Sequence, residues 1–90
     1  DGLKKTYFHI QSNPITNGVL EVEIDRASQK GNQFLLMDIT GKTVYLEQKY
    51  DHINGTEMSM DVSNLPSGMY WLTLTIDNQR LQTAQVVIYQ

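Results

Sequence analysis

The sequence predicts an all-β fold, an antiparallel β-sandwich of about seven short strands. Three observations support this prediction. Apolar and polar residues alternate along much of the chain, as in half-buried strands, and helical periodicity is nearly absent. Turn-forming residues recur at intervals of about 8–12 residues. Several predicted strands have one polar face, which suits the solvent side of a two-sheet sandwich better than a barrel.

The first half of the chain contains three predicted strands. The first covers residues 6–11 and is ended by the stretch SNPITNG, because Pro14 cannot donate a ladder hydrogen bond and the Asn-Gly pair accepts positive φ. The second, VLEVEI at residues 19–24, alternates apolar residues with glutamate. The third, FLLMDI at residues 34–39, is apolar on both faces, which predicts a central, covered strand.

Four further strands are predicted in the second half. The letters DITG form a turn into a fourth strand at residues 43–48, so that residues 33–48 make a β-hairpin. A fifth strand, residues 57–62, follows an Asn-Gly turn and alternates strictly. The proline-glycine turn in NLPSG leads into MYWLTLTI at residues 69–76, and after the tight turn DNQR the chain closes with LQTAQVVIYQ at residues 81–90.

Length and composition restrict the class of protein. The chain has 90 residues, a net charge of −3 and no cysteine, which predicts a single domain stabilised by its core without disulfides. Basic residues never cluster beyond Lys4-Lys5, so no nucleic-acid partner is expected. The start, DGLKKTYFHI, has neither a hydrophobic signal core nor an initiator Met, so we expect a piece of a longer chain or a processed one.

No set of residues suggests catalysis. His9 and His52 are far apart, and neither has an H-x-H or cysteine partner of the kind that zinc sites use. The serines lack a nucleophile-elbow context, and the acidic residues near positions 51–57 do not match a calcium-loop pattern. We therefore expect no enzyme, no cofactor and no metal.

Two features leave binding functions open. Tyr45, Tyr50, Trp71 and Tyr89 could stack on sugar faces, although packing of Trp71 under a loop or against Tyr45 explains it more simply. The last strand carries no charge after Arg80, whereas edge strands are usually protected by charge or proline. Either it is a well-paired interior strand, or it is available to a partner by strand addition, which would also permit self-association through an edge.

Three stretches resemble those of a known family. SNPITNGVLEVEI is similar to the family's N-P opening, FLLMDITGKTVYLEQ to its D-x-x-G-K hairpin, and MDVSNLPSGMYWLTL to its L-x-x-G-x-Y signature. In their order and spacing they resemble the type A C-terminal sorting domain of the type IX secretion system of Bacteroidetes-type bacteria. The resemblance covers about residues 7–89 and implies an immunoglobulin-like sandwich.

The resemblance implies a targeting role rather than catalysis. A cargo attached to the N-terminal side would cross the inner membrane, and the domain would be recognised in the periplasm by the outer-membrane translocon and its shuttle proteins. A sortase-like cysteine protease at the cell surface would then cut upstream of the domain, and the cargo would stay on the surface or be released. Residues 1–5 would be a linker remnant near the cut and residues 6–90 the sorting domain.

The resemblance also assigns residues to two groups. The sorting motif falls on Asn13, Pro14, Asp38, Gly41, Lys42, Leu65, Gly68 and Tyr70. The terminal-strand motif, to which recognition by the translocon is assigned, falls on Ala84, Val86, Val87, Ile88, Tyr89 and Gln90. Family members commonly carry Lys or Arg near the C-terminus, whereas AQVVIYQ has neither.

Most of the sorting motif also has a structural explanation. Its glycines suit turns with positive φ, its proline suits the start of a turn, and Leu65 and Tyr70 suit the core. We therefore expect most of these residues to fold the signal, and only the terminal strand with nearby loops to touch the machinery. The alternative function is an extracellular carbohydrate-binding or adhesion module, which would remain attached to its protein.

Overall fold

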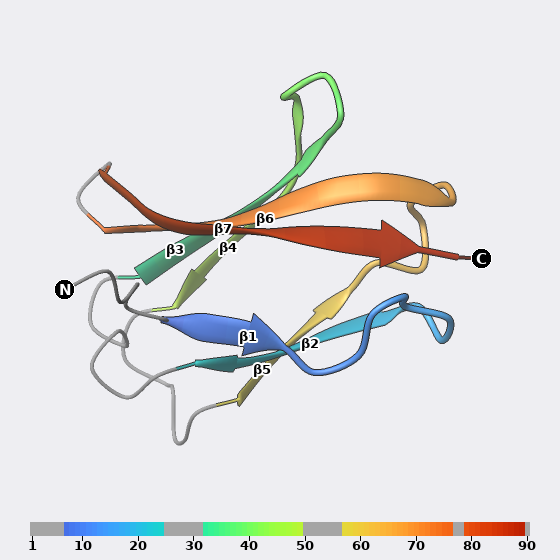
Figure 1. Ribbon diagram of the computed structural model, residues 1–90, viewed down its shortest axis with the longest axis horizontal. Helices are drawn as coiled ribbons and strands as arrows, with labels where there is room; N and C mark the ends of the chain where they lie inside the picture. Colours follow the sequence, from blue (N-terminus) through green and yellow to red (C-terminus); the bar gives the residue numbers. More distant parts are fainter. Residues whose placement is uncertain (1–6, 25–31, 50–56, 77–78, 90) are drawn as a thin grey trace, which may run out of the picture.

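The computed structural model describes residues 7–24, 32–49, 57–76 and 79–89 (Figure 1). Within these ranges the chain forms strands and no helix, so no helix is long and apolar enough to cross a membrane. The strands are β1 (Phe8–Ile10), β2 (Val19–Ile24), β3 (Asn32–Asp38), β4 (Thr43–Lys49), β5 (Glu57–Asp61), β6 (Gly68–Ile76) and β7 (Gln79–Ile88).

The strands form two antiparallel sheets that face each other, as the sequence predicts. One sheet has three strands in the order β1-β2-β5, and the other has four in the order β4-β3-β6-β7. Figure 1 shows them as two layers, with the C-terminal end of β7 beside the loop that joins β1 to β2. The prediction of a central third strand is confirmed, because β3 lies between β4 and β6. The last strand is not interior: β7 is an edge strand of its sheet.

The core lies between the sheets and follows the period-two alternation. In β2, for example, Leu20, Val22 and Ile24 are buried whereas Glu21 is exposed. Phe8 of one sheet and Phe34 of the other contact edge to face, with ring centroids 5.4 Å apart and planes at 78°. The buried apolar residues are Phe8, Ile15, Leu20, Val22, Ile24, Phe34, Leu36, Met58, Met60, Val62, Tyr70, Leu72, Leu74, Val86 and Ile88.

Strand ends differ from the prediction by at most two residues, and β2 has the predicted bounds. β7 begins at Gln79, inside the predicted turn DNQR, because Gln79 and Arg80 continue the ladder opposite Ile76 and Thr75 across a β-bulge. β1 covers only Phe8–Ile10, since the chain then turns into the loop around Pro14. The predicted domain boundary between residues 5 and 6 lies outside the described residues, as do His52 and the Asn-Gly turn before β5.

Two buried threonines of β6, Thr73 and Thr75, alternate with the core residues of that strand. Thr73 is 0% exposed although it alternates with the core residues Leu72 and Leu74. It sits in the middle of the sheet, opposite Leu35 on one side and Thr83 on the other. The hydroxyl oxygens of Thr73 and Thr83 are 3.0 Å apart and form a cross-strand hydrogen bond.

Candidate functional site

The end of β7, which carries most of the predicted recognition residues, is enclosed on two sides by the fold itself. Val86 and Ile88 point into the core and are 0% and 1% exposed. Along one edge β6 pairs with the strand, with Met69 opposite Val87 and Gly68 opposite Ile88. Buried side chains cannot reach a partner while the domain is folded, so only the outer edge and the outer face of this strand remain to be considered.

The outer edge of β7 is covered by the segment that follows β1. The Asn13 side-chain amide donates from Nδ2 to the Gln85 carbonyl at 3.0 Å, and its Oδ1 accepts from the Val87 amide at 2.9 Å. The Asn13–Pro14 peptide bond is cis. Ile15 then forms a parallel bridge: its amide donates to the Val87 carbonyl at 2.8 Å, and the Tyr89 amide donates to its carbonyl at 2.9 Å. Asn13 and Ile15 thus act as a short substitute strand.

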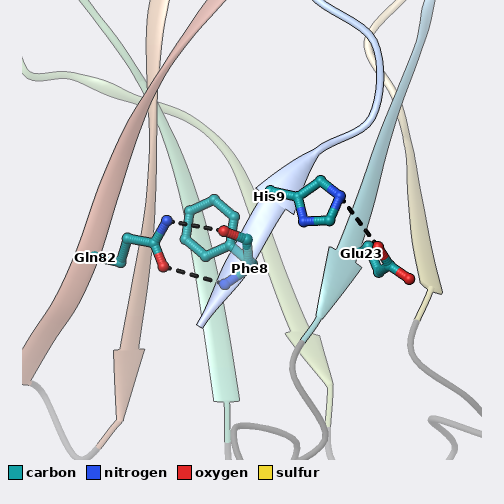
Figure 2. A network of polar contacts seen from close by, with 4 residues as sticks. All are labelled: Phe8, His9, Glu23 and Gln82. Carbon is teal, nitrogen blue, oxygen red and sulfur yellow. Dashed lines mark hydrogen bonds and ion pairs between the residues drawn. The ribbon is translucent and has the colours of Figure 1, made fainter. Parts of the chain in front are cut away.

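A second side-chain amide, that of Gln82 near the middle of β7, ties β7 to β1 of the other sheet. Figure 2 shows Gln82 facing the backbone of Phe8: its Oε1 accepts from the Phe8 amide at 3.1 Å, and its Nε2 donates to the Phe8 carbonyl at 2.9 Å. The same Oε1 accepts from the Tyr7 amide at 2.7 Å. On the far side of β1, His9 Nε2 lies 3.1 Å from Glu23 Oε1, an exposed pair that adds little stability. β1 is therefore tied to both sheets.

The Asp38 turn is organised by its carboxylate. Asp38 Oδ1 accepts from the Thr40 hydroxyl at 2.5 Å, from the Thr40 amide at 2.9 Å and from the Lys42 amide at 3.1 Å. The Thr40 hydroxyl is the main cause that lowers the pKa of Asp38. Desolvation partly opposes it, and the two backbone amides and the Lys42 charge lower the pKa further by smaller amounts. Gly41 has φ 88°, which a side chain would make unfavourable. Asp38, Gly41 and Lys42 therefore form a turn, with Gly41 and Lys42 exposed to solvent.

Tyr70 fastens the loop between β5 and β6. Its ring is buried, and its hydroxyl donates to the Pro66 carbonyl at 2.7 Å, four residues upstream. This is the tyrosine corner of immunoglobulin-like sandwiches, found where the chain enters the strand that follows a crossover between sheets. Burial, and to a lesser degree the negative charge of Asp38, raises the pKa of Tyr70. Leu65 of the same loop packs against the core.

The structure brings part of the sorting motif against the terminal strand. Asp38, Tyr70 and Val86 lie in one row across β3, β6 and β7, and Gly68 lies opposite Ile88 in the same sheet. Asn13 bonds the neighbouring residues of β7 from the loop after β1. Asn13 and the β6 residues thus contact β7 directly, whereas Asp38 lies one strand away from it, beside Tyr70. Lys42 remains on its turn, and Gln90 lies outside the described residues.

Two residues of this site were not predicted from the sequence. Ile15 follows Pro14 and is 1% exposed, so an apolar residue after the loop proline was the available signal. Gln82 resembles any polar residue of an exposed strand, and nothing in its local sequence distinguishes it.

The carbohydrate hypothesis depends on four aromatic side chains, and the structure describes two of them. Trp71 is 36% and Tyr89 70% exposed. Tyr50 and the side chain of Tyr45 lie outside the description. Among the described residues, no group of three or more histidine, aspartate or glutamate side chains is arranged to hold a metal ion.

Comparisons with known proteins agree with this architecture. A family model described as "Secretion system C-terminal sorting domain" matches residues 9–89. Among solved structures, the first immunoglobulin domain of mouse SynCAM 2 is similar, with a TM-score of 0.56, 16% identity, and coverage of 91% of this chain and 92% of that one. At this identity the likeness concerns the fold alone, and it confirms the immunoglobulin-like sandwich. Comparison with curated protein sequences gives no match.

Proposed function

The chain belongs to the family of secretion system C-terminal sorting domains, and on this premise we propose that the secretion machinery recognises the folded domain at the end of β7, residues 84–90. The sorting motif, in this proposal, holds the strand in the position that is recognised. One observation carries the proposal: two segments that are far apart in the sequence, Asn13–Ile15 after β1 and Gly68–Tyr70 of β6, converge on Val86, Val87 and Ile88.

Family membership establishes the broad role. The domain is a type IX C-terminal sorting signal; it interacts with the type IX secretion machinery and marks its protein for the cell surface or the extracellular space. The signal is not itself catalytic.

The convergence supports a division of labour between the two groups of residues. Tyr70 is buried and bonded to the loop at Pro66, and Asp38 has its carboxylate engaged by its own turn. Side chains engaged in such intramolecular contacts stabilise the fold and are poorly available for hydrogen bonds to a partner. Tyr89, by contrast, is 70% exposed and directly follows β7, the strand with which Tyr70 pairs. We therefore assign recognition to the translocon and its shuttle proteins acting on the terminal strand.

The order of events in the proposal follows the family's route. The cargo on the N-terminal side crosses the inner membrane, the folded domain is recognised in the periplasm, and a sortase-like cysteine protease removes the domain at the cell surface. The contacts of Tyr7 and Phe8 with Gln82 support a cut upstream of residue 7, because a cut beyond them would fall within the bonded strand. We propose residues 1–5 as the linker near the cut and residues 6–90 as the signal.

The test is deletion of residues 86–90 from a cargo that carries the domain. We expect the cargo to remain in the periplasm, because the deletion removes the proposed recognition element. Trypsin treatment of the retained protein shows whether the rest of the domain is folded. A matched control, Glu21→Gln, changes an exposed residue of the other sheet and leaves export unchanged. Normal surface display of the deleted form would refute the proposal.

A further inference from the structure

One surface of the terminal strand remains open in the folded domain. Its inner face is buried at Val86 and Ile88, β6 pairs with one edge, and Asn13 and Ile15 bond the other. A partner that binds this strand in the folded domain therefore has to contact its outer face. Simple strand addition at the β7 edge would first have to displace the segment that contains Asn13.

The outer face at this end of the sheet is apolar. Met69 and Trp71 alternate along β6 with the buried Tyr70, and Met69 lies opposite Val87 of β7. Tyr89 follows Val87 with the same alternation. We call these four residues the outer patch: Met69, Trp71, Val87 and Tyr89. Three of the four large exposed apolar side chains among the described residues belong to it, at 42% for Met69, 36% for Trp71 and 70% for Tyr89. Scattered surface residues would not gather in this way.

We propose that the outer patch is the surface through which the secretion machinery contacts the terminal strand, and that its occupant is a protein surface with an apolar recess for Trp71 and Tyr89. This inference rests on the proposed function. It specifies in addition which face of the sheet is contacted and that the contact is apolar. Trp and Tyr are the residues most enriched at energetically dominant positions of protein interfaces. None of the four side chains is charged. A highly charged surface that bound here would lose its hydration and gain no oppositely charged group in exchange, which is unfavourable.

The size of the patch argues against a stable second copy as the occupant. With about 200 Å² for a large side chain, the exposed fractions of Met69, Trp71 and Tyr89 amount to about 300 Å². A stable interface buries about 800 Å² on each partner. Two copies joined through this patch alone would fall well short of that. A small contact with two aromatic anchors fits a signal that is bound and then released.

The experiment uses the full-length cargo protein in the bacterium that exports it. The double variant Trp71→Gln with Tyr89→Ser removes both anchors and leaves the core residues of β7 in place. We expect surface display to fall about tenfold or more, the loss that follows removal of a dominant interface side chain. The retained domain should stay resistant to trypsin. The conservative pair Trp71→Phe with Tyr89→Phe should restore display, and Glu21→Gln should match the unmodified protein.

Several outcomes would overturn the inference. Normal display of the double variant, while the form lacking residues 86–90 is retained, would refute the outer patch and leave the proposed function standing. Normal display of both would refute the proposed function itself. Loss of trypsin resistance together with loss of display would show that Trp71 and Tyr89 act through the fold. A dimer in sedimentation, or retention on a glycan column, that disappears in the double variant while display stays normal would assign the patch to a second copy or to carbohydrate.

Discussion

Replacing Asn13 with alanine removes two hydrogen bonds from the edge of β7, one to the Gln85 carbonyl at 3.0 Å and one from the Val87 amide at 2.9 Å. A hydrogen bond contributes about 0.5–1.5 kcal/mol to the free energy of unfolding. Both bonds are exposed, so water can take the place of the lost partner in part. We expect the free energy of unfolding to fall by about 1–2 kcal/mol. For a domain of this size the melting temperature should fall by about 5–15 °C.

The assay combines thermal unfolding with amide hydrogen exchange. The Val87 amide should lose protection, because Asn13 Oδ1 is its acceptor. The Leu72 amide, in the middle of the four-stranded sheet, should change only as far as global stability changes. Asn13→Asp keeps an acceptor for Val87 but places a negative oxygen against the Gln85 carbonyl, so it should be destabilising while Val87 stays partly protected.

The control for this series is Asn64→Ala, which removes an exposed asparagine from the turn before β6. It should leave the melting temperature nearly unchanged. An Asn13→Ala variant with an unchanged melting temperature and an unchanged exchange rate at Val87 would refute the view that Asn13 holds the terminal strand.

Three further predictions concern the rest of the sorting motif. Tyr70→Phe should lower the free energy of unfolding by about 1 kcal/mol in denaturant titration, because the bond to the Pro66 carbonyl is lost while the ring stays in the core; no change would show that water replaces this bond fully. Gly41→Ala should cost about 1–2 kcal/mol in the same titration, because φ is 88° there although a Cβ would meet no atom within 4 Å, and Gly41→Asn should cost less. The lowered pKa of Asp38 means that its carboxylate stabilises the fold above the unfolded pKa of about 4 and that this contribution is lost as pH falls through the lower folded value. Asp38→Asn should therefore weaken the pH dependence of the melting temperature in acid, and an identical acid profile for both proteins would contradict the role of Thr40 as the donor that lowers this pKa.

Much of the fold could be predicted because strand signals are local. The alternation in β2 and β5 placed the buried residues correctly, and the doubly apolar β3 was recognised as central for the same reason. Strand ends were less predictable. At Gln79 and Arg80 the polar composition indicates a turn, but pairing with β6 across a bulge extends the ladder through them.

The candidate site was predictable only in part. Gly18 and Gly41 have the positive φ that their turn sequences indicated. The roles of Asn13 and Gln82 were not readable, because both amides bond residues more than 70 positions away. An amide side chain can form the same hydrogen bonds as the backbone of a strand residue, but the local sequence does not show which strand it will bond. For the same reason the outer patch could not be located, since its residues come from two strands whose register is a property of the sheet.

The sequence by itself determined the β class, the approximate strands, the turn chemistry and the family, because each depends on residue type and spacing along the chain. Only the tertiary structure decided that β7 lies at a sheet edge, that Asn13 covers this edge while Gln82 ties β7 to β1, and that Met69, Trp71 and Tyr89 share one exposed face. The physical reason is that edges and faces arise when distant segments pack together, and the burial and hydrogen bonding that select one packing are properties of the whole domain.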